Sequence, residues 1–275
     1  NLGIISYYDD IVGNLKVAHC DNIQCSSAAI TTLDSAGNMG WDTSIAIGVD
    51  GLPLIGYINV DTLDLKVAHC ADIACTSATF TPYGGLGITG RLVSLAIGSD
   101  GFGLISYYES VSGDLLVAHC QDVACASATH TSIDTTGDVG GHPSIAIGND
   151  GLGIISYYDA TNAAHKIAHC DNISCTSATY KTITGGSGLT YSAIAIGADD
   201  LPIVIFSSLD STNGYLKAVH CNTATCSNFS IYVIEDRQSS YPAVAIGPDG
   251  LALISHFDYN MMDLKVVHCD DIACL

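Results

Sequence analysis

The chain has 275 residues, of which 48% are apolar and only 13% are charged, and 28 acidic against 8 basic residues give a net charge of −20. This charge repels nucleic-acid phosphates and anionic lipid surfaces, so nucleic acid is excluded as a partner. No apolar run reaches the ~18 to 20 residues that a membrane span needs. The acidic residues can also serve only to keep an apolar, β-rich chain soluble. The net charge by itself therefore does not identify a binding partner.

One repeat of about 50 residues runs along the whole chain, and its clearest mark is LKVAHCDNIQC at residues 15–25. Its first cysteine returns after 50, 50, 50, 51 and 48 residues. A fixed period of this length indicates a solenoid, a propeller or an array. Because no linker interrupts the repeats, we expect a single domain over residues 1–275. The repeats are expected at about 1–42, 43–91, 92–141, 142–190, 191–240 and 241–275.

Each complete repeat contains four predicted strands. The first is typified by SIAIG and is expected at residues 43–48, 93–98, 143–148, 192–197 and 242–247. A turn such as Asp50-Gly51 follows, because Asp-Gly readily adopts the positive φ angles of a tight hairpin. The second strand is typified by GIISYYD and the third by LKVAHC, and the fourth is the Thr-rich run after the second cysteine.

Neither SIAIG nor GIISYY alternates apolar and polar residues, which indicates burial on both faces. Blades of a β-propeller are packed between neighbours and have this character. Six third strands therefore predict an all-β, six-bladed β-propeller. The first and fourth strands each occur only five times, because the chain opens on a second strand and stops after Cys274. We expect the first and last blades to be incomplete, and the chain to be a processed form or a fragment.

All twelve cysteines fall into C-x4-C pairs, which predicts one disulfide per blade and an extracellular or cell-surface location. The predicted pairs are Cys20 with Cys25, Cys70 with Cys75, Cys120 with Cys125, Cys170 with Cys175, Cys221 with Cys226 and Cys269 with Cys274. A metal site is the alternative, because His-Cys followed by Cys offers three soft ligands. Zinc would need a fourth ligand six times, and adjacent residues of a strand point to opposite faces. Covalent haem attachment would need C-x-x-C-H, which is absent.

Six equivalent histidines precede the first cysteines, namely His19, His69, His119, His169, His220 and His268. We expect each to make a buried structural hydrogen bond to a serine, a tyrosine or a carbonyl of the adjacent blade. Catalysis is the alternative, because Ser6, Ser106, Ser156 and Ser255 lie in second strands with an acidic residue three positions on. Since these residues recur in blade after blade, whereas an active site needs one asymmetric constellation, we predict that none of them is catalytic.

Acidic residues end the second strands, and the set is Asp9, Glu109, Asp159, Asp210 and Asp258. Together with the Asp-Gly turns they are candidates for Ca²⁺, which binds carboxylate and carbonyl oxygens. No D-x-D-x-D-G loop is present. No other cofactor or metal is expected.

The run SIAIGNDGLGIISYYD, followed by LKVAHC-type strands and a second cysteine, resembles tandem-repeat β-propeller proteins of secreted and surface-exposed microbial origin. The resemblance covers nearly the whole chain and carries no catalytic motif. It implies extracellular placement and a scaffolding or adhesive role.

Three functions are considered. The first is a non-enzymatic structural or adhesive propeller that pairs with copies of itself through strand edges of its incomplete blades, which leads to a filament. The second is a lectin-like propeller for carbohydrate or another cell-surface ligand, with Tyr8, Tyr108 and Tyr158 as contact candidates. The third is a glycosidase or lyase. We predict the first, and therefore no enzymatic activity.

Overall fold

The computed structural model describes residues 2–84, 90–183, 191–209 and 214–274. The chain is a six-bladed β-propeller, and its described residues form six antiparallel sheets, each with one disulfide. The predicted fold class and its 50-residue repeat are confirmed. Within the described ranges, no helix is long and apolar enough to cross a membrane.

The chain divides into two compact units. Unit 1 comprises Asn1–Ser112 with Leu116–Thr131, and unit 2 comprises Gly113–Leu115 with Ser132–Leu275. The division falls within the third blade, whose two outer strands each contribute a few residues to unit 2. The single domain expected from the sequence stays a prediction.

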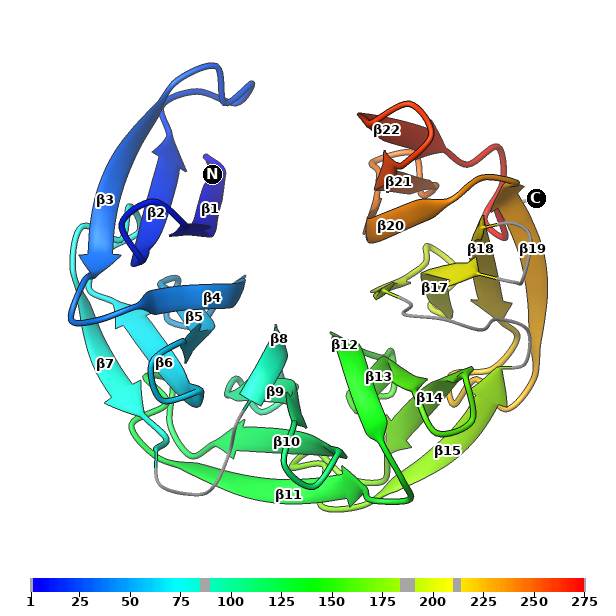
Figure 1. Cartoon of the computed structure of the whole chain (residues 1–275), viewed down its shortest axis with the longest axis horizontal. Coiled ribbons are helices and arrows are strands. Elements are labelled where there is room, and N and C mark those ends of the chain that lie inside the picture. Colours follow the sequence, from blue (N-terminus) through cyan, green and yellow to red (C-terminus); the bar gives the residue numbers. More distant parts are fainter. Residues whose placement is uncertain (1, 85–89, 184–190, 210–213, 275) are drawn as a thin grey trace. The chain divides into compact units, whose positions relative to one another are not determined.

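Unit 1 contains blades 1 and 2 and most of blade 3, and consecutive strands of each blade pair side by side. Blade 1 consists of β1 (Ile4–Asp9), β2 (Asn14–Cys20) and β3 (Ala28–Asp34). Blade 2 consists of β4 (Met39–Ile47), β5 (Pro53–Asn59), β6 (Asp64–Cys70) and β7 (Ala78–Pro82). Blade 3 consists of β8 (Gly90–Ile97), β9 (Gly103–Glu109), β10 (Asp114–Cys120) and β11 (Ala128–Asp134). In this unit β1, β4 and β8 line one side of the blades, and β3, β7 and β11 line the other (Figure 1).

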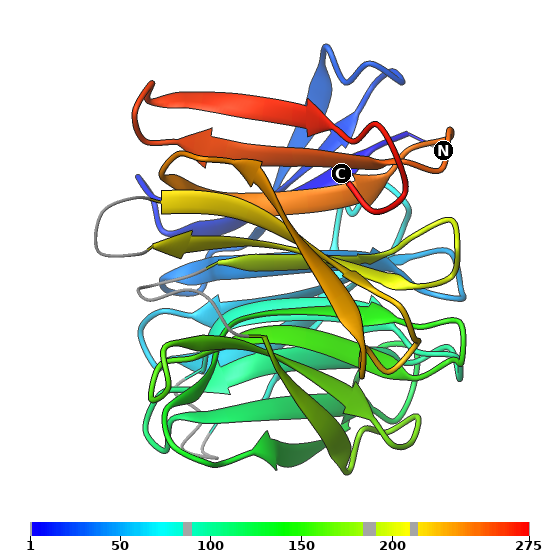
Figure 2. The ribbon, with the colours of Figure 1, turned by 90° about the vertical axis from the view of Figure 1, so that its right-hand side faces the viewer.

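Unit 2 contains blades 4 to 6. Blade 4 consists of β12 (Val139–Ile147), β13 (Gly153–Asp159), β14 (Ala164–Cys170) and β15 (Ala178–Ile183). Blade 5 consists of β16 (Ser192–Ile196), β17 (Pro202–Leu209), β18 (Gly214–Cys221) and β19 (Phe229–Glu235). Blade 6 consists of β20 (Ser239–Ile246), β21 (Ala252–Asp258) and β22 (Asp263–His268). The outer strand β19 is strongly twisted against β18 (Figure 2), as expected of β-strands of L-amino acids.

The second strand of each full blade is buried on both faces, which explains its unbroken apolar sequence. In β5, Leu54 belongs to a core cluster with Val93 of blade 3, whereas Ile55 belongs to a cluster with Leu15 and Val17 of blade 1. Leu54 and Ile55 are at most 1% exposed. Burying one such side chain stabilises the fold by roughly 1.5–3 kcal/mol.

The predicted disulfides are confirmed in all six blades, with Cα–Cα distances of 4.8–4.9 Å. In each pair the second cysteine has a positive φ, for example 54° at Cys75. Hydrogen bonds hold this turn, because Cys75 N–H donates to the Asp72 carbonyl and Ala74 N–H donates to the Asp72 carboxylate. Several disulfides of this kind fit a secreted or extracellular protein.

Loss of one disulfide is expected to lower stability modestly. In the chain-entropy model, closing a loop this short contributes about 2 kcal/mol. The double variant Cys120→Ala with Cys125→Ala should therefore lower the free energy of unfolding in urea by about 2 kcal/mol. A loss below roughly 0.5 kcal/mol, which is typical of neutral surface substitutions, would contradict the prediction.

The histidines of the third strands pair within their own blade, not with the adjacent one as predicted. His69 Nε2 lies 2.8 Å from Asp50 Oδ2, in the Asp-Gly turn of the same blade. The register explains the partner, because His69 is aligned with Leu54, just beyond that turn. The same 2.8–2.9 Å contact recurs at His119, His169, His220 and His268. Their predicted partners, a serine, a tyrosine or a carbonyl across the blade interface, are therefore wrong for these five histidines.

Candidate functional site

The acidic residues considered for Ca²⁺ close the turns after their own strands. Asp9 accepts from Ile11 N–H, Glu109 from Val111 N–H and Asp258 from Asn260 N–H. Asp159 accepts from the backbone and the side chain of Asn162. Asp210 lies outside the described residues. In the described part of the chain, no three His, Cys, Asp or Glu residues gather in a way that could hold a metal ion.

The serines and tyrosines of the second strands also form structural contacts. Ser156 Oγ lies 2.9 Å from Ser192 Oγ, and Ser6 Oγ lies 2.8 Å from Thr43 Oγ1. In the register Ser156 is aligned with Ile167, whereas His169 is aligned with Ile154. The strand pairing therefore separates the serine from the histidine along the blade. The tyrosine hydroxyls considered for ligand contact do not form an exposed rim, because Tyr158 is buried and Tyr8 donates to Asn38.

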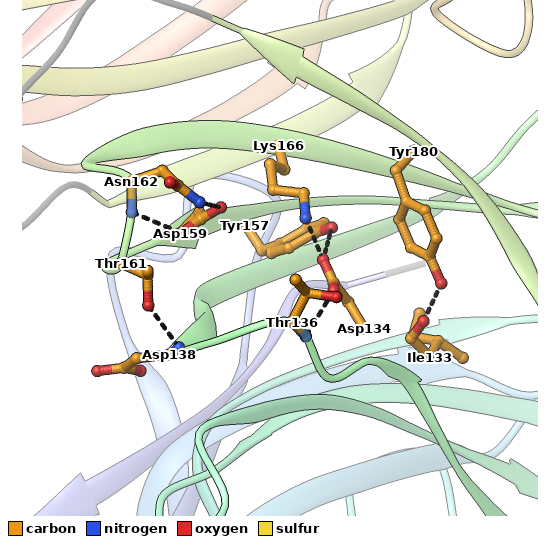
Figure 3. Close-up of polar contacts among 10 residues, drawn as sticks. All are labelled: Ile133, Asp134, Thr136, Asp138, Tyr157, Asp159, Thr161, Asn162, Lys166 and Tyr180. Carbon is orange, nitrogen blue, oxygen red and sulfur yellow. Dashed lines mark hydrogen bonds and ion pairs between the residues drawn. The ribbon is translucent and has the colours of Figure 1, made fainter.

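A buried cluster of Asp134, Tyr157 and Lys166 joins the end of β11 to blade 4 (Figure 3). The Tyr157 hydroxyl donates to Asp134 Oδ2 at 2.7 Å, and Lys166 Nζ pairs with the same oxygen. Burial raises the pKa of Asp134, but hydrogen bonds from Lys166, Tyr157 and Thr136 N–H outweigh it and leave the pKa lowered.

The same cluster occurs in unit 1, where Asp34 Oδ2 lies 2.6 Å from both Lys66 Nζ and the Tyr57 hydroxyl. The repetition indicates a structural element that fastens the outer strand of one blade to the next.

The first strands of blades 2, 3, 4 and 6 begin earlier than predicted, whereas that of blade 5 begins at Ser192 as predicted. In blade 4 the expected range was 143–148, but β12 starts at Val139. The added residues cross a β-bulge, since Gly141 is aligned with Tyr158 and the next aligned pair is Ser144 with Ser156. The sequence pattern missed it because a bulge interrupts the regular spacing. We call the residue at the place of His142 the bulge position.

The bulge position carries a different residue in almost every blade. The φ angle is 50° at Asp42, 66° at Leu92, 49° at His142 and 53° at Tyr241, and Tyr191 takes the equivalent place in the sequence of blade 5. The left-handed region costs a residue other than glycine roughly 1–2 kcal/mol. Bulges re-aim side chains and are frequent beside active sites. A variable position inside a strict repeat is the sequence signal that would have found them.

In unit 2 the bulge position gathers three aromatic rings. The ring centroids of His142 and Tyr191 lie 4.0 Å apart, and those of Tyr191 and Tyr241 lie 4.1 Å apart. Ser192 Oγ donates to the His142 carbonyl at 3.1 Å and fastens blade 5 to blade 4. Tyr241 is 58% exposed, whereas the other two rings are half-buried. Burial lowers the pKa of His142 to about 4, so its ring is neutral at pH 7.

Two carboxylates lie at the same end of the blades as these rings. Asp159 is aligned with Val139, at the start of β12, and Asp258 is aligned with Ser239, at the start of β20. Both side chains are buried. The hydrogen bond from Lys265, at 2.6 Å, lowers the pKa of Asp258 to about 2, so this carboxylate is ionised at neutral pH.

No family model matches the chain, and no curated protein matches it. Solved structures share its fold. An arginine-to-alanine mutant of AofleA from Arthrobotrys oligospora is 9% identical with a TM-score of 0.63, and the match covers 98% of this chain and 87% of AofleA. A GH43 β-1,3-galactosidase with galactodeoxynojirimycin is 10% identical with a TM-score of 0.54, and the match covers 85% of this chain and 92% of that one.

NanB, in a structure with Optactamide, is 10% identical with a TM-score of 0.63 over 92% of this chain. The chain spans 62% of NanB and 31% of a bifunctional GH43-CE protein from Bacteroides eggerthii. At identities this low, the likeness shows the fold alone.

These comparisons contradict the prediction of a non-enzymatic structural or adhesive propeller. Solved chains with this fold include α-L-arabinofuranosidases, a xylan β-1,4-xylosidase and a β-1,3-galactosidase. The prediction took the repetition of residues as an argument against an active site. That argument overlooked that the repeat is not strict at every position, since the residue at the bulge position differs between blades.

Proposed function

We propose that the chain is a glycoside-acting enzyme of the hydrolase class, with His142, Tyr191 and Tyr241 in contact with the sugar. The observation that carries this proposal is the row of three mutually tilted aromatic rings in unit 2, which is made from residues that do not follow the repeat.

The chemistry of the three rings suits a sugar. An aromatic ring offers an apolar face to the C–H groups of a pyranose, and the tyrosine hydroxyl and imidazole nitrogens can hydrogen-bond its hydroxyl groups. Because His142 is neutral at pH 7, it offers one donor and one acceptor. Tyr241 is the most exposed of the three rings, so it is the first that a ligand meets.

The charge of the protein suits the reaction. Glycoside hydrolysis passes through an oxocarbenium-like transition state, which develops positive charge and is assisted by a pair of carboxyl groups. A net charge of −20 favours a developing cation. Asp258 is fully buried, so it contributes charge rather than contact. Several fold neighbours carry glycosidase names, and the disulfides support extracellular placement.

Binding of an iminosugar tests the proposal, because a protonated iminosugar resembles the cationic transition state. We expect galactodeoxynojirimycin or another iminosugar of a small panel to bind in isothermal titration calorimetry. Tyr241→Ala should weaken that binding by roughly tenfold, through loss of one stacked ring. Tyr232→Ala, on the outer strand β19, is the matched control and should leave the affinity unchanged. Equal affinities for the two variants would refute the role of the rings.

A further inference from the structure

One core position of the repeat carries a histidine in blade 4 and a leucine in the other five blades. It is His165 in β14, and its equivalents are Leu15, Leu65, Leu115, Leu216 and Leu264. His165 is 2% exposed, and in the described part of the chain neither of its ring nitrogens has a hydrogen-bond partner. Burial lowers the pKa of His165 to about 3, although the nearby backbone of Ser207 and of Tyr157 opposes this effect, so the ring is neutral at pH 7. A buried polar group without a partner costs free energy, and leucine would avoid that cost here.

Within blade 4, His165 lies close to the bulge. It is aligned with Tyr158 of the neighbouring strand β13, and the centroids of the two rings are 5.8 Å apart. Tyr158 is in turn aligned with Gly141 of β12, the residue before His142. One buried side chain, that of Tyr158, therefore connects His165 to the bulge that presents His142.

His165 also contacts blade 5, which belongs to the same unit. Its ring centroid lies 4.2 Å from that of Phe206 in β17, which is 1% exposed. Phe206 is aligned with Ser192 of β16, the residue after Tyr191, and Ser192 Oγ donates to the His142 carbonyl. His165 thus reaches the segments of both rings, His142 and Tyr191, through one buried aromatic side chain each.

We propose that His165 is a positioning residue of the candidate site, which keeps the rings of His142 and Tyr191 in contact. Its own ring packs against Tyr158 in one blade and against Phe206 in the next. Protein interiors are close-packed, so a flat imidazole and a branched leucine set the positions of neighbouring side chains differently. The sugar-binding role of the two rings rests on the proposed function, whereas the contact between them does not.

His165→Leu restores the residue of the repeat and tests the proposal on the whole protein. We expect its midpoint of unfolding in urea to stay the same or to rise, since two unpartnered nitrogens are removed. The contact between the two rings should loosen. In an NMR titration, the pKa of His142 should therefore rise from about 4 toward the ordinary value of ~6.5, because burial is what lowers it. The affinity for the iminosugar that the wild-type protein binds should fall by roughly three- to tenfold.

His130→Leu is the matched control. His130 also has one buried ring nitrogen without a partner, but it belongs to unit 1, where its other nitrogen lies 2.9 Å from the Tyr107 hydroxyl. This variant should leave the pKa of His142 and the iminosugar affinity unchanged. The proposal is overturned if His165→Leu leaves the pKa of His142 at its wild-type value, or if it lowers stability and affinity together, as loss of a purely structural residue would. If no iminosugar binds the wild-type protein, the proposed function fails, and the titration of His142 still decides whether His165 positions the rings.

Discussion

Replacing Asp134 by alanine is expected to lower the free energy of unfolding by about 3–5 kcal/mol, which is the usual effect of removing one partner of a buried ion pair. The variant leaves the Lys166 ammonium and the Tyr157 hydroxyl without their shared acceptor, in a site where the Lys166 side chain is 11% exposed and that of Asp134 4%. Equilibrium unfolding in urea measures the loss.

Two further variants serve as controls for this substitution. Lys16→Met removes a pair with Asp9 at the equivalent place of blade 1, where the side chains are 22% and 20% exposed. We expect that variant to lose much less stability than Asp134→Ala, as for other exposed pairs. The double variant Asp134→Leu with Lys166→Met should recover most of the loss, because it leaves no unpaired buried charge. If Asp134→Ala costs no more than Lys16→Met, the cluster does not fasten the blades.

The same carboxylate predicts the acid sensitivity of the fold. The pKa of Asp134 is lowered on folding, so its contribution is complete above the unfolded pKa of ~3.9 and is lost as the pH falls through the folded value. The pKa values of Asp34 and Asp258 are lowered as well. We expect the melting temperature to fall between about pH 4 and pH 2, and to fall less steeply in Asp134→Ala. Equal slopes for both proteins would count against the ion pair.

Replacing Gly140 by alanine is the second substitution with a large expected effect. Gly140 has a φ of +100°, and an added Cβ would lie 2.8 Å from the Cα atom and 2.9 Å from the backbone nitrogen of Leu115. Left-handed strain of roughly 1–2 kcal/mol and overpacking of roughly 1–3 kcal/mol then act together. We expect a loss of about 3 kcal/mol in urea unfolding.

Gly51→Ala separates the two causes, because Gly51 has a φ of +80° but nothing within 4 Å of an added Cβ. That variant should lose only the strain, about 1–2 kcal/mol. If the two variants lose the same stability, the contact with Leu115 contributes nothing and strain alone explains Gly140.

The fold could be predicted from the sequence because its determinants are local and repeated. The pairing of Cys120 with Cys125 needs only a five-residue separation, and the turn at Asp150-Gly151 needs only two adjacent residues. Six copies of such signals leave little choice of architecture. The partner of His119 was missed because Asp100 lies nineteen residues away, and only the strand register brings the two together.

The candidate site was missed for a different reason. His142, Tyr191 and Tyr241 are about 50 residues apart and belong to no motif, so no short sequence pattern identifies them. They meet because, in unit 2, the bulge positions of neighbouring blades lie next to one another. The prediction relied on residues that recur in every blade, and these residues build the scaffold. It therefore passed over the positions that differ between blades.

Turnover of a panel of 4-nitrophenyl glycosides, with the folded protein verified by circular dichroism, tests the central claim most directly. We predict release of nitrophenolate from at least one glycoside, with a kcat/KM that falls at least roughly tenfold in Tyr241→Ala and stays unchanged in Tyr232→Ala. Absence of turnover on every glycoside, or turnover that Tyr241→Ala leaves intact, would contradict the claim that the three aromatic rings of unit 2 serve a glycoside-acting enzyme.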